Sequence, residues 1–220
     1  MDDLRPTLMP LGDSALLVRF DRRLDMRANG AAISLARQLG ANPPNGVGEI
    51  VPNLVSVLIR YDPGVTNFAT LAGDLRLVLF GLGADADANA GAHHVVQVRF
   101  GGSEGPDIEE VASSLDMSVA DFIAAHNANP LRVLTTGFAP GFVYCGLHDE
   151  ALHLPRRQDV RAKVPPGTIL FAAGQTAIAA TAIPTGWHVI GQTGFRNFDA
   201  TKTPPTKLHA GDTIRFEAVS

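Results

Sequence analysis

The sequence predicts an α+β protein in which an N-terminal two-layer α/β sandwich is followed by a β barrel or compact β sandwich. Before residue 84, short apolar extended runs alternate with amphipathic helical patterns in the order β-β-α-β-β-α. From Leu131 onward the helical periodicity disappears, and short β runs are punctuated by Gly and Pro. Segment 84–92 contains only Ala, Asp, Asn and Gly, with no large apolar side chain to anchor it. We therefore expect an N-terminal domain over residues 1–84, a linker over 85–92 and a second domain over 93–220.

The first elements are a pair of strands and a helix. Extended apolar runs cover Leu8–Pro10 and Ser14–Phe20, which favours a hairpin. A helix is predicted over Met26–Leu39, because its apolar residues recur at helical spacing. Asp25 is the expected N-cap and Gly40 the expected stop signal.

The second half of this domain repeats the pattern. Strands are predicted over Val47–Val51 and Leu54–Tyr61, and the sequence Asp-Pro-Gly after them indicates a turn. Thr66 is the expected N-cap of a second helix. The apolar side of that helix is formed by Phe68, Leu71, Leu75, Val78 and Leu79.

Beyond the expected linker, Val95–Phe100 is predicted to be a strand followed by two short helices. Pro106 and Asp107 are expected to open the first helix. Ser118 and Asp121 form a start similar to a capping box for the second, which would end near Ala128.

Charge and cysteine content exclude several classes of protein. The net charge is −4, from 18 Lys plus Arg and 22 Asp plus Glu, and no basic cluster is denser than the pair Arg156-Arg157. Nucleic acid is therefore not an expected partner, because phosphate binding needs a concentrated positive face. The single cysteine, Cys145, excludes an internal disulfide and is expected to be a small buried apolar residue. With no apolar leader at the N-terminus, we expect a cytoplasmic protein.

The long uncharged stretch Val164–Phe195 does not predict a membrane helix. Its length would allow one, but Pro165, Gly174, Pro184 and Gly191 interrupt it. An isolated helix in lipid could not satisfy the backbone groups that such residues free. We expect buried strands separated by turns, and no membrane partner.

A match to G-x-S-x-G at Gly101–Gly105 resembles the nucleophile elbow of serine hydrolases. That geometry requires a helix to begin at the serine, whereas here Gly105, Pro106 and Asp107 supply a separate helix start. We expect a plain turn and do not expect Ser103 to be a nucleophile. A Walker A loop and a strand-linked G-x-G-x-x-G are both absent from the sequence.

The histidines do not predict a metal site. His148 and His153 lie five residues apart, which is not a spacing of known zinc motifs, and we expect a solvated loop. His126, near the end of a predicted helix, is expected to favour the negative end of the helix dipole.

Polar side chains at the ends of apolar strands indicate a cleft in the second domain. Gly141 is expected to let a ligand approach the backbone closely, and Arg156 and Arg161 could clamp an anion. No catalytic residue is predicted. The candidate substrate-binding residues are Phe138, Pro140, Gly141, Phe142, Tyr144, Arg156, Arg161, Gln175, Trp187, His188 and Gln192.

Several ordered segments resemble the motifs of one known family. Gly137–Tyr144 is similar to its G-F-x-P-G-F-x-Y stretch, and Pro184–Thr193 to its P-G-G-W-x-x-I-G-x-T segment. Between them come a P-R pair at Pro155-Arg156, V-P-x-G-[ST] at Val164–Thr168 and G-x-Q-T at Gly174–Thr176. Over nearly its whole length the chain resembles the family of allophanate hydrolase subunit 1 and the B-type subunit of 5-oxoprolinase.

This resemblance implies an α/β domain followed by a cyclophilin-like β-barrel domain. It also implies a larger partner, similar to allophanate hydrolase subunit 2 or to the C-type subunit of 5-oxoprolinase. Together they would hydrolyse a small amide, lactam or carboxylate substrate, with ATP and Mg acting at the level of the complex. The chain itself would bind no cofactor tightly and would be inactive alone. The alternative, implied by the relative KipI, is a regulatory protein that inhibits a sensor histidine kinase.

The chain departs from the family pattern at a few positions. Thr185 replaces the second Gly of P-G-G-W, Cys145 replaces a Leu, and Gln192 stands where Arg is common. Ala177–Ala180 contains Ala179 where the family has the Tyr of G-I-Y-P. We expect these departures to bear on substrate identity and activity rather than on the fold.

Overall fold

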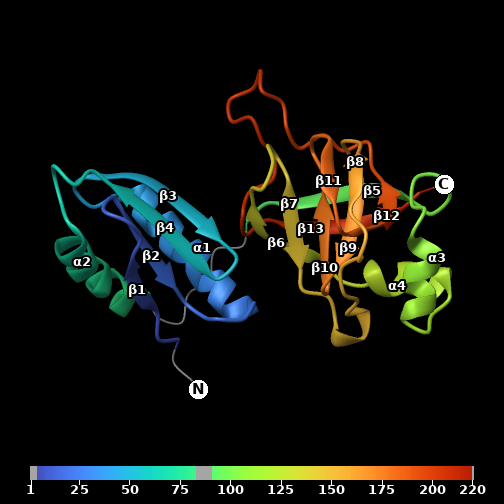
Figure 1. Ribbon diagram of the computed structural model, residues 1–220, viewed down its shortest axis with the longest axis horizontal. Coiled ribbons are helices and arrows are strands. Elements are labelled where there is room, and N and C mark those ends of the chain that lie inside the picture. Colours follow the sequence, from blue (N-terminus) through green and yellow to red (C-terminus); the bar gives the residue numbers. More distant parts are fainter. Residues whose placement is uncertain (1–3, 83–90, 220) are drawn as a thin grey trace. The chain divides into compact units, whose positions relative to one another are not determined.

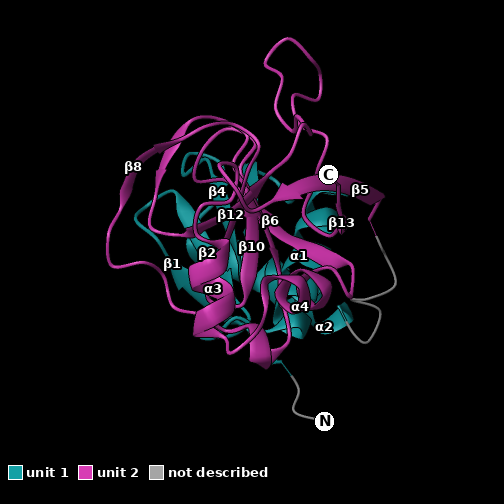
Figure 2. Cartoon of the chain, turned by 90° about the vertical axis from the view of Figure 1, so that its right-hand side faces the viewer, with its two compact units in different colours: residues 1–90 teal, residues 91–220 magenta. Residues whose placement is uncertain are grey.

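The computed structural model describes residues 4–82 and 91–219. The chain divides into two compact units, unit 1 over residues 1–90 and unit 2 over residues 91–220 (Figure 2). The expected linker over 85–92 lies outside the described residues except for 91 and 92, so that boundary stays a prediction.

Unit 1 is an antiparallel sheet covered by two helices (Figure 1). The strand order is β1-β2-β4-β3, with every neighbouring pair antiparallel. The strands are β1 (Thr7–Pro10), β2 (Ala15–Arg19), β3 (Val47–Asn53) and β4 (Ser56–Tyr61), and the helices are α1 (Met26–Ala41) and α2 (Phe68–Gly81).

The core of unit 1 lies between this sheet and its helices. Leu16 of β2 and Ile59 of β4 are fully buried and directly opposite each other across the two strands. Leu35 of α1 and Leu75 of α2 are also fully buried in the same cluster. The two helices therefore share one apolar layer with the sheet, as a two-layer sandwich requires.

The helix ends of unit 1 differ in part from the prediction. Asp25 caps α1 as expected, accepting from the N–H groups of Arg27 and Ala28. The helix does not end at Gly40 but continues to Ala41. The N-cap of α2 is Asn67 rather than Thr66, because the Asn67 side chain accepts the N–H of Thr70. Asn and Thr are both good N-caps, so neighbouring candidates are hard to separate from sequence.

Unit 2 is a closed barrel with the strand order β10-β7-β6-β13-β5-β12-β9. Only β13 and β5 pair in parallel among the barrel strands described. The barrel strands are β5 (His93–Phe100), β6 (Leu131–Thr136), β7 (Val143–Gly146), β9 (Thr168–Ala172), β10 (Gln175–Ile178), β12 (His188–Gln192) and β13 (Thr213–Ala218). The other elements are the helices α3 (Ile108–Ser114) and α4 (Val119–His126), a 3₁₀ turn (Glu150–Leu152), and β8 (Arg161–Val164) paired with β11 (Ile183–Thr185). The predicted α+β class, a sandwich followed by a barrel, is confirmed.

Alternating side chains give the barrel wall two apolar faces. Ile169 and Phe171 of β9 belong to the cluster that fills the interior. Leu170, between them, belongs to a second cluster on the outer face, together with Val164 of β8 and Ile183 of β11. The two-stranded β8–β11 ribbon therefore packs against the outside of the barrel and forms a further layer there.

The turn before α3 lies directly against β12. Gly101 donates its N–H to the carbonyl of Ile190 at 3.1 Å, and Asp107 donates to the carbonyl of Val189 at 3.0 Å. The β12 register against β9 shifts between Val189 and Gly191. A Cβ at Gly105 would lie 2.1 Å from the Ile190 carbonyl oxygen, so only glycine fits there.

We expect Gly105→Ala to destabilise the protein by about 3 kcal/mol or more, because the added methyl group meets backbone that cannot move aside. Gly73→Ala in α2 is the control: nothing lies within 4 Å of a Cβ there, and alanine should stabilise the helix by about 1 kcal/mol. Urea unfolding of both variants measures the difference. Equal stabilities would contradict the close approach at Gly105.

Candidate functional site

The outer face of the barrel, beside the β8–β11 ribbon, carries a row of aromatic side chains. Phe138 and Phe142 have ring centroids 5.5 Å apart, Phe142 and Tyr144 4.7 Å, and Tyr144 and Trp187 5.9 Å. The Arg156 guanidinium lies 5.6 Å from the centre of the Trp187 ring, at the distance of a cation–π contact. Five of the predicted site residues thus form one group, which we call the aromatic row.

The aromatic row has a buried end and an exposed end. Trp187 is buried, whereas Phe138 is 70% exposed. Phe138 also has a φ of 75°, a left-handed conformation that is uncommon for an aromatic residue and is often found at functional sites. Burial raises the pKa of Tyr144, and the nearby charge of Arg156 partly opposes that shift. Tyr144 therefore carries its proton and can donate a hydrogen bond.

Gly141 approaches protein rather than a free surface. A Cβ there would lie 2.5 Å from the Cβ of Phe198, and the side chain of Asn197 donates to the Gly141 carbonyl at 2.8 Å. The expectation that Gly141 admits a ligand to the backbone is therefore wrong: its φ of 68° and its lack of a side chain serve the packing of the turn. Pro140 is exposed on the same turn.

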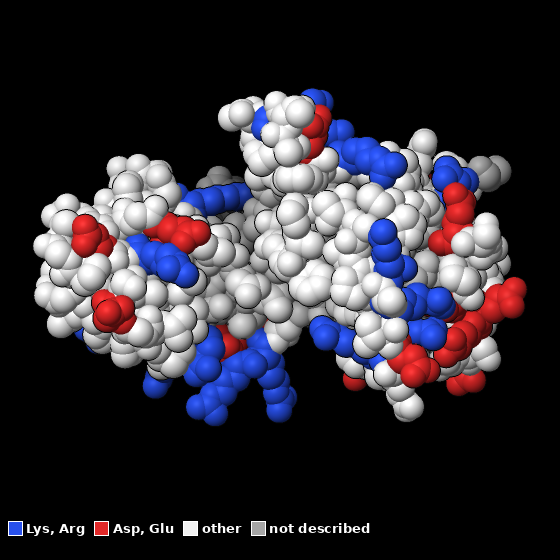
Figure 3. Space-filling model, turned by 45° about the horizontal axis from the view of Figure 1, so that its top comes forward, with Lys and Arg blue, Asp and Glu red and all other residues white. Residues whose placement is uncertain are grey.

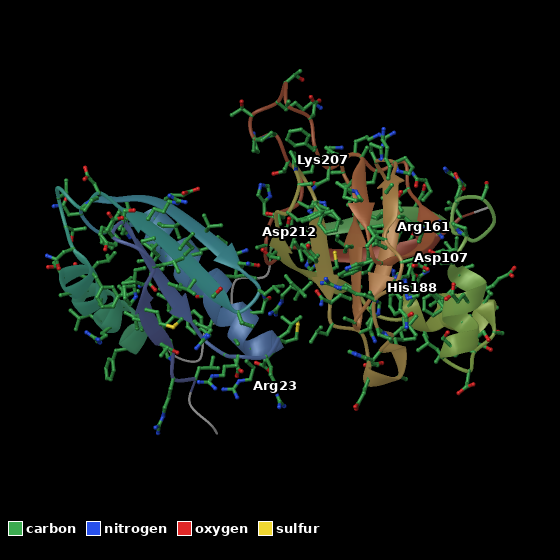
Figure 4. All side chains as sticks on the ribbon, viewed as in Figure 1. Arg23, Asp107, Arg161, His188, Lys207 and Asp212 are labelled. Atoms are coloured by element: carbon green, nitrogen blue, oxygen red, sulfur yellow. The ribbon has the colours of Figure 1, made fainter. Side chains whose placement is uncertain are left out.

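A buried carboxylate ties together the elements beside the aromatic row. The Asp107 side chain is only 4% exposed. Its Oδ1 accepts from Arg157 Nη1 at 3.0 Å and from Arg161 Nη2, while its Oδ2 accepts the Val189 N–H at 2.7 Å. Figure 4 shows Asp107 and Arg161 close together beside α3. We call this set of four residues the Asp107 cluster.

The Asp107 cluster changes two expectations. Asp107 starts α3 as predicted, but its side chain makes no capping bond because it is used by the two arginines and the β12 backbone. Arg161, expected to clamp a substrate anion together with Arg156, instead pairs with Asp107. Arg156 lies over Trp187, so the two arginines belong to separate groups.

A pocket of about 380 Å³ opens next to the Asp107 cluster. Arg161 and Lys163 of β8 line it, together with Ser103 and Glu104 of the turn before α3 and Gln192 of β12. On the face shown in Figure 3, basic side chains of unit 2 lie beside acidic ones. The sequence prediction identified Arg161 and Gln192 at this pocket but missed Lys163.

Two predicted residues, Gln192 and His188, are held by the protein itself. Gln192 donates to the Pro166 carbonyl at 2.7 Å and accepts from the Thr168 hydroxyl at 3.2 Å. His188 is buried and bonded through Nε2 to the carbonyl of Pro155 at 3.1 Å. Gln175 begins β10 opposite Gly146, outside the residues that line the pocket. The contacts of Gln192 and His188 fit a structural role better than direct contact with a substrate.

Ser103 and Cys145 have surroundings that do not make them nucleophiles. Gly101–Gly105 is a turn, as expected, and no residue in the described chain forms a hydrogen bond with the Ser103 side chain that could activate it. Cys145 is fully buried, and that burial raises the pKa of its thiol. A thiol that remains protonated is not an effective nucleophile.

Two histidines meet one threonine inside the barrel, which the sequence analysis did not predict. His126 of α4 and His148 each place Nε2 2.8 Å from the hydroxyl of Thr176 on β10. Their ring centroids are 4.8 Å apart, and Phe171 lies against both rings. The expectation that His148 belongs to a solvated loop is therefore wrong.

The hydrogen bonds fix the tautomer of each ring. His126 Nδ1 carries a proton, because it lies 2.7 Å from the side-chain oxygen of Asn127. Its bare Nε2 accepts the only hydroxyl proton of Thr176, so His148 must donate its Nε2 proton to the same oxygen. The chain of donors runs from His148 through Thr176 to His126 and Asn127, and both rings are neutral.

Burial accounts for the neutral state. It lowers the pKa of His126 from 6.5 to about 4, and burial together with the charge of His126 lowers the pKa of His148 to about 3. The expected interaction of a charged His126 with the helix dipole does not occur near neutral pH, because the ring carries no charge. Among the residues described, no group of three or more His, Cys, Asp and Glu side chains could hold a metal ion.

Comparison with known proteins identifies the family. A family model for the carboxyltransferase domain, subdomain C and D, matches residues 6–208. The chain belongs to this family. The resemblance to the B-type subunit of 5-oxoprolinase is confirmed as well: the protein of that name from Bacillus subtilis (strain 168) is 30% identical over 229 residues, which cover 99% of this chain and 94% of the relative.

Solved structures of similar proteins show the same fold. The crystal structure of TTHA0988 is 30% identical, with a TM-score of 0.80 over 94% of this chain. This chain spans 40% of the length of that protein. Urea carboxylase from Kluyveromyces lactis has a TM-score of 0.79 over the whole chain and 22% of its own length; at 19% identity it shows the fold alone. No helix within residues 4–82 and 91–219 is long and apolar enough to cross a membrane.

We expect Asp107→Asn to destabilise this family member by about 3–5 kcal/mol, because Arg161 loses its carboxylate and the partly buried Arg157 keeps only the exposed Glu110. Glu104→Gln is the control. It breaks only the more exposed pair with Arg99 and should leave the free energy of unfolding nearly unchanged. Urea unfolding at neutral pH measures both variants, and a similar small loss for the two would show that the Asp107 cluster does not hold the barrel together.

The histidine pair predicts a loss of stability in acid. Each folded-state pKa lies below the unfolded value of 6.5, so the unfolded chain binds more protons as the pH falls. The stability that the two neutral histidines contribute is fully present above pH 6.5. Below that pH it falls by up to about 1.4 kcal/mol per histidine for each pH unit. The decline ends once the pH has passed the folded-state pKa values, which are about 4 for His126 and about 3 for His148.

The check is urea unfolding at several pH values for the wild type, His148→Gln and the control His153→Gln, whose histidine is exposed. The free energy of unfolding of His148→Gln should depend less steeply on pH than that of the wild type, whereas His153→Gln should follow the wild type. Parallel curves for all three proteins would rule out a buried neutral His148.

Proposed function

We propose that the chain is the B-type subunit of an ATP-dependent 5-oxoprolinase-like hydrolase, acting with a larger subunit on a small lactam or amide. The observation that carries the proposal is the similarity to the 5-oxoprolinase relative from Bacillus subtilis, which extends over 99% of this chain at 30% identity. That relative is named as a subunit, which supports a partner. The match to a carboxyltransferase-domain model supports chemistry at a small carbonyl group.

The second unit offers the surface best suited to a small substrate. The aromatic row provides flat apolar rings, and exposed Arg156 provides a cation at one end of it. The neighbouring pocket has the size of a small-molecule site and combines apolar walls with two cations. We assign substrate binding to this region, with Phe138, Tyr144 and Arg156 as the contacts on the aromatic row.

ATP is expected to act as a co-substrate of the whole complex. Transfer of its terminal phosphoryl group to the amide oxygen would release ADP and activate the amide carbon for addition of water. The resulting tetrahedral intermediate would expel the amine, which breaks the C–N bond and leaves an acyl phosphate. A second water would hydrolyse the acyl phosphate to a carboxylate and phosphate. No residue of this chain is assigned to the phosphoryl transfer.

The test is to co-express the chain with the larger subunit from the same genome and to measure ADP release with 5-oxoproline or allophanate. We expect 5-oxoproline to stimulate ADP release by the complex and not by the chain alone. A chain that forms no such complex, or a complex that turns over neither substrate, would sink the proposal. Inhibition of a sensor histidine kinase by the free chain would then favour the regulatory alternative.

Within an active complex, Arg156→Gln should lower kcat/KM for the substrate about tenfold or more, because a charge-assisted contact is lost. Arg215→Gln, an exposed arginine of β13 paired with Glu217, is the matched control and should leave kcat/KM unchanged. The stability of both variants is compared by thermal unfolding. Equal activity of the two variants would remove Arg156 from the substrate site.

A further inference from the structure

The pocket beside the Asp107 cluster has an excess of positive charge. Arg161 and Lys163 are the cations that line it, and Glu104 is the acidic residue. The negative charge of Glu104 is already paired with Arg99, which donates to both of its carboxylate oxygens at 2.7 Å. Those hydrogen bonds lower the pKa of Glu104 and keep it ionised. The charge of Lys163 has no such match: its ammonium group forms no ion pair with any residue that the structure describes.

Arg161 contributes a fixed donor group to the same pocket. Its Nη2 is held by Asp107, which also accepts from Arg157. The Arg161 side chain is 36% exposed and lines the pocket, so N–H groups that Asp107 does not use can reach a ligand oxygen there. Fixed by Asp107, the guanidinium loses little conformational freedom when an anion arrives.

The remaining walls restrict what kind of anion fits. Val164 of β8 and Val189 of β12 make part of the wall apolar. The amide of Gln192 and the hydroxyl of Thr168 are turned to protein carbonyls and to each other, so they add few free donors. A phosphate group prefers several donors around its oxygens. A carboxylate on a small apolar body needs only the two cations and the apolar wall.

We propose that this pocket binds the carboxylate of a small organic acid, with the Lys163 ammonium as its ion-pair partner and Arg161 as its second donor. The identity of that acid as the substrate rests on the proposed function: 5-oxoproline combines one carboxylate with a small lactam ring. Lys163 is then a specificity-determining residue, because it distinguishes the acid from the corresponding neutral amide. The apolar part of the substrate lies against Val164 and Val189.

The lysine content of the chain allows a direct test. The lysines are Lys163, Lys202 and Lys207, so reductive methylation with ¹³C-formaldehyde labels few sites and keeps their charge. Lys→Arg variants assign each signal. The labelled chain is titrated with 5-oxoproline, with its neutral carboxamide and with inorganic phosphate. We expect the Lys163 signal to shift saturably with 5-oxoproline, to stay in place with the carboxamide, and to respond more weakly to phosphate.

Several outcomes would overturn the carboxylate site. The first is a Lys163 signal that does not shift with 5-oxoproline. The second is a Lys163 signal that shifts equally with 5-oxoproline and with its carboxamide. The third is a Lys163 signal that shifts saturably with phosphate but not with 5-oxoproline. The Lys202 signal is an internal control, because Lys202 is exposed and pairs with Asp199. A uniform shift of all lysine signals would indicate non-specific charge effects and would also count against the site.

The complex gives a second readout. Lys163→Gln should raise KM for 5-oxoproline about tenfold or more without a comparable loss of kcat, and Lys202→Gln should not. An unchanged KM in an active complex contradicts the carboxylate site but leaves the proposed function standing. A Lys163 signal that shifts with 5-oxoproline in the free chain, beside an inactive complex, contradicts the proposed function alone. Weaker binding of the larger subunit with an unchanged KM would mean that Lys163 pairs with the partner.

Discussion

The buried carboxylate of Asp107 holds together the parts of the barrel on which the candidate site depends. It joins the start of α3 to Arg161 of β8, to Arg157 before the ribbon, and to the backbone of β12. The two guanidinium groups share this carboxylate, and Arg157 also lies 3.6 Å from a carboxylate oxygen of the more exposed Glu110. Removing a buried carboxylate of this kind lowers the free energy of unfolding by far more than the loss of a solvent-exposed ion pair does. The reason is that the cations remain, poorly solvated and without their counter-charge.

How much of this could be read from sequence depends on the distance between partners along the chain. Asp25 and Ser118 cap helices that begin at the next residue, and both were predicted from local pattern. Asp107 was recognised only as a helix start, because its partners lie 50, 54 and 82 residues away. The local sequence looks the same for an aspartate that caps a helix and for one that forms an ion pair with an arginine far along the chain.

In the candidate site, too, the sequence predicted residues that lie in short motifs and missed contacts between distant segments. The residues of the aromatic row were predicted because they cluster in short motifs and resemble a known family, and the fold brings them together. The same motifs included Gly141, whose small size serves the packing against Phe198. Lys163 was missed because a lone lysine in a strand has no distinctive signal. The pairing of His126 with His148 through Thr176 needs three separate elements, so only the folded barrel reveals it.

Trp187 is the only tryptophan of the chain, and it lies within the aromatic row, almost fully buried, with Tyr144 on one side and the Arg156 guanidinium over its ring. Its fluorescence therefore reports on one place in the molecule. A charged group over an indole shifts its emission, and a neighbouring tyrosine passes excitation energy to it. The protein thus contains its own optical probe, through which changes at the aromatic row can be followed without any added label.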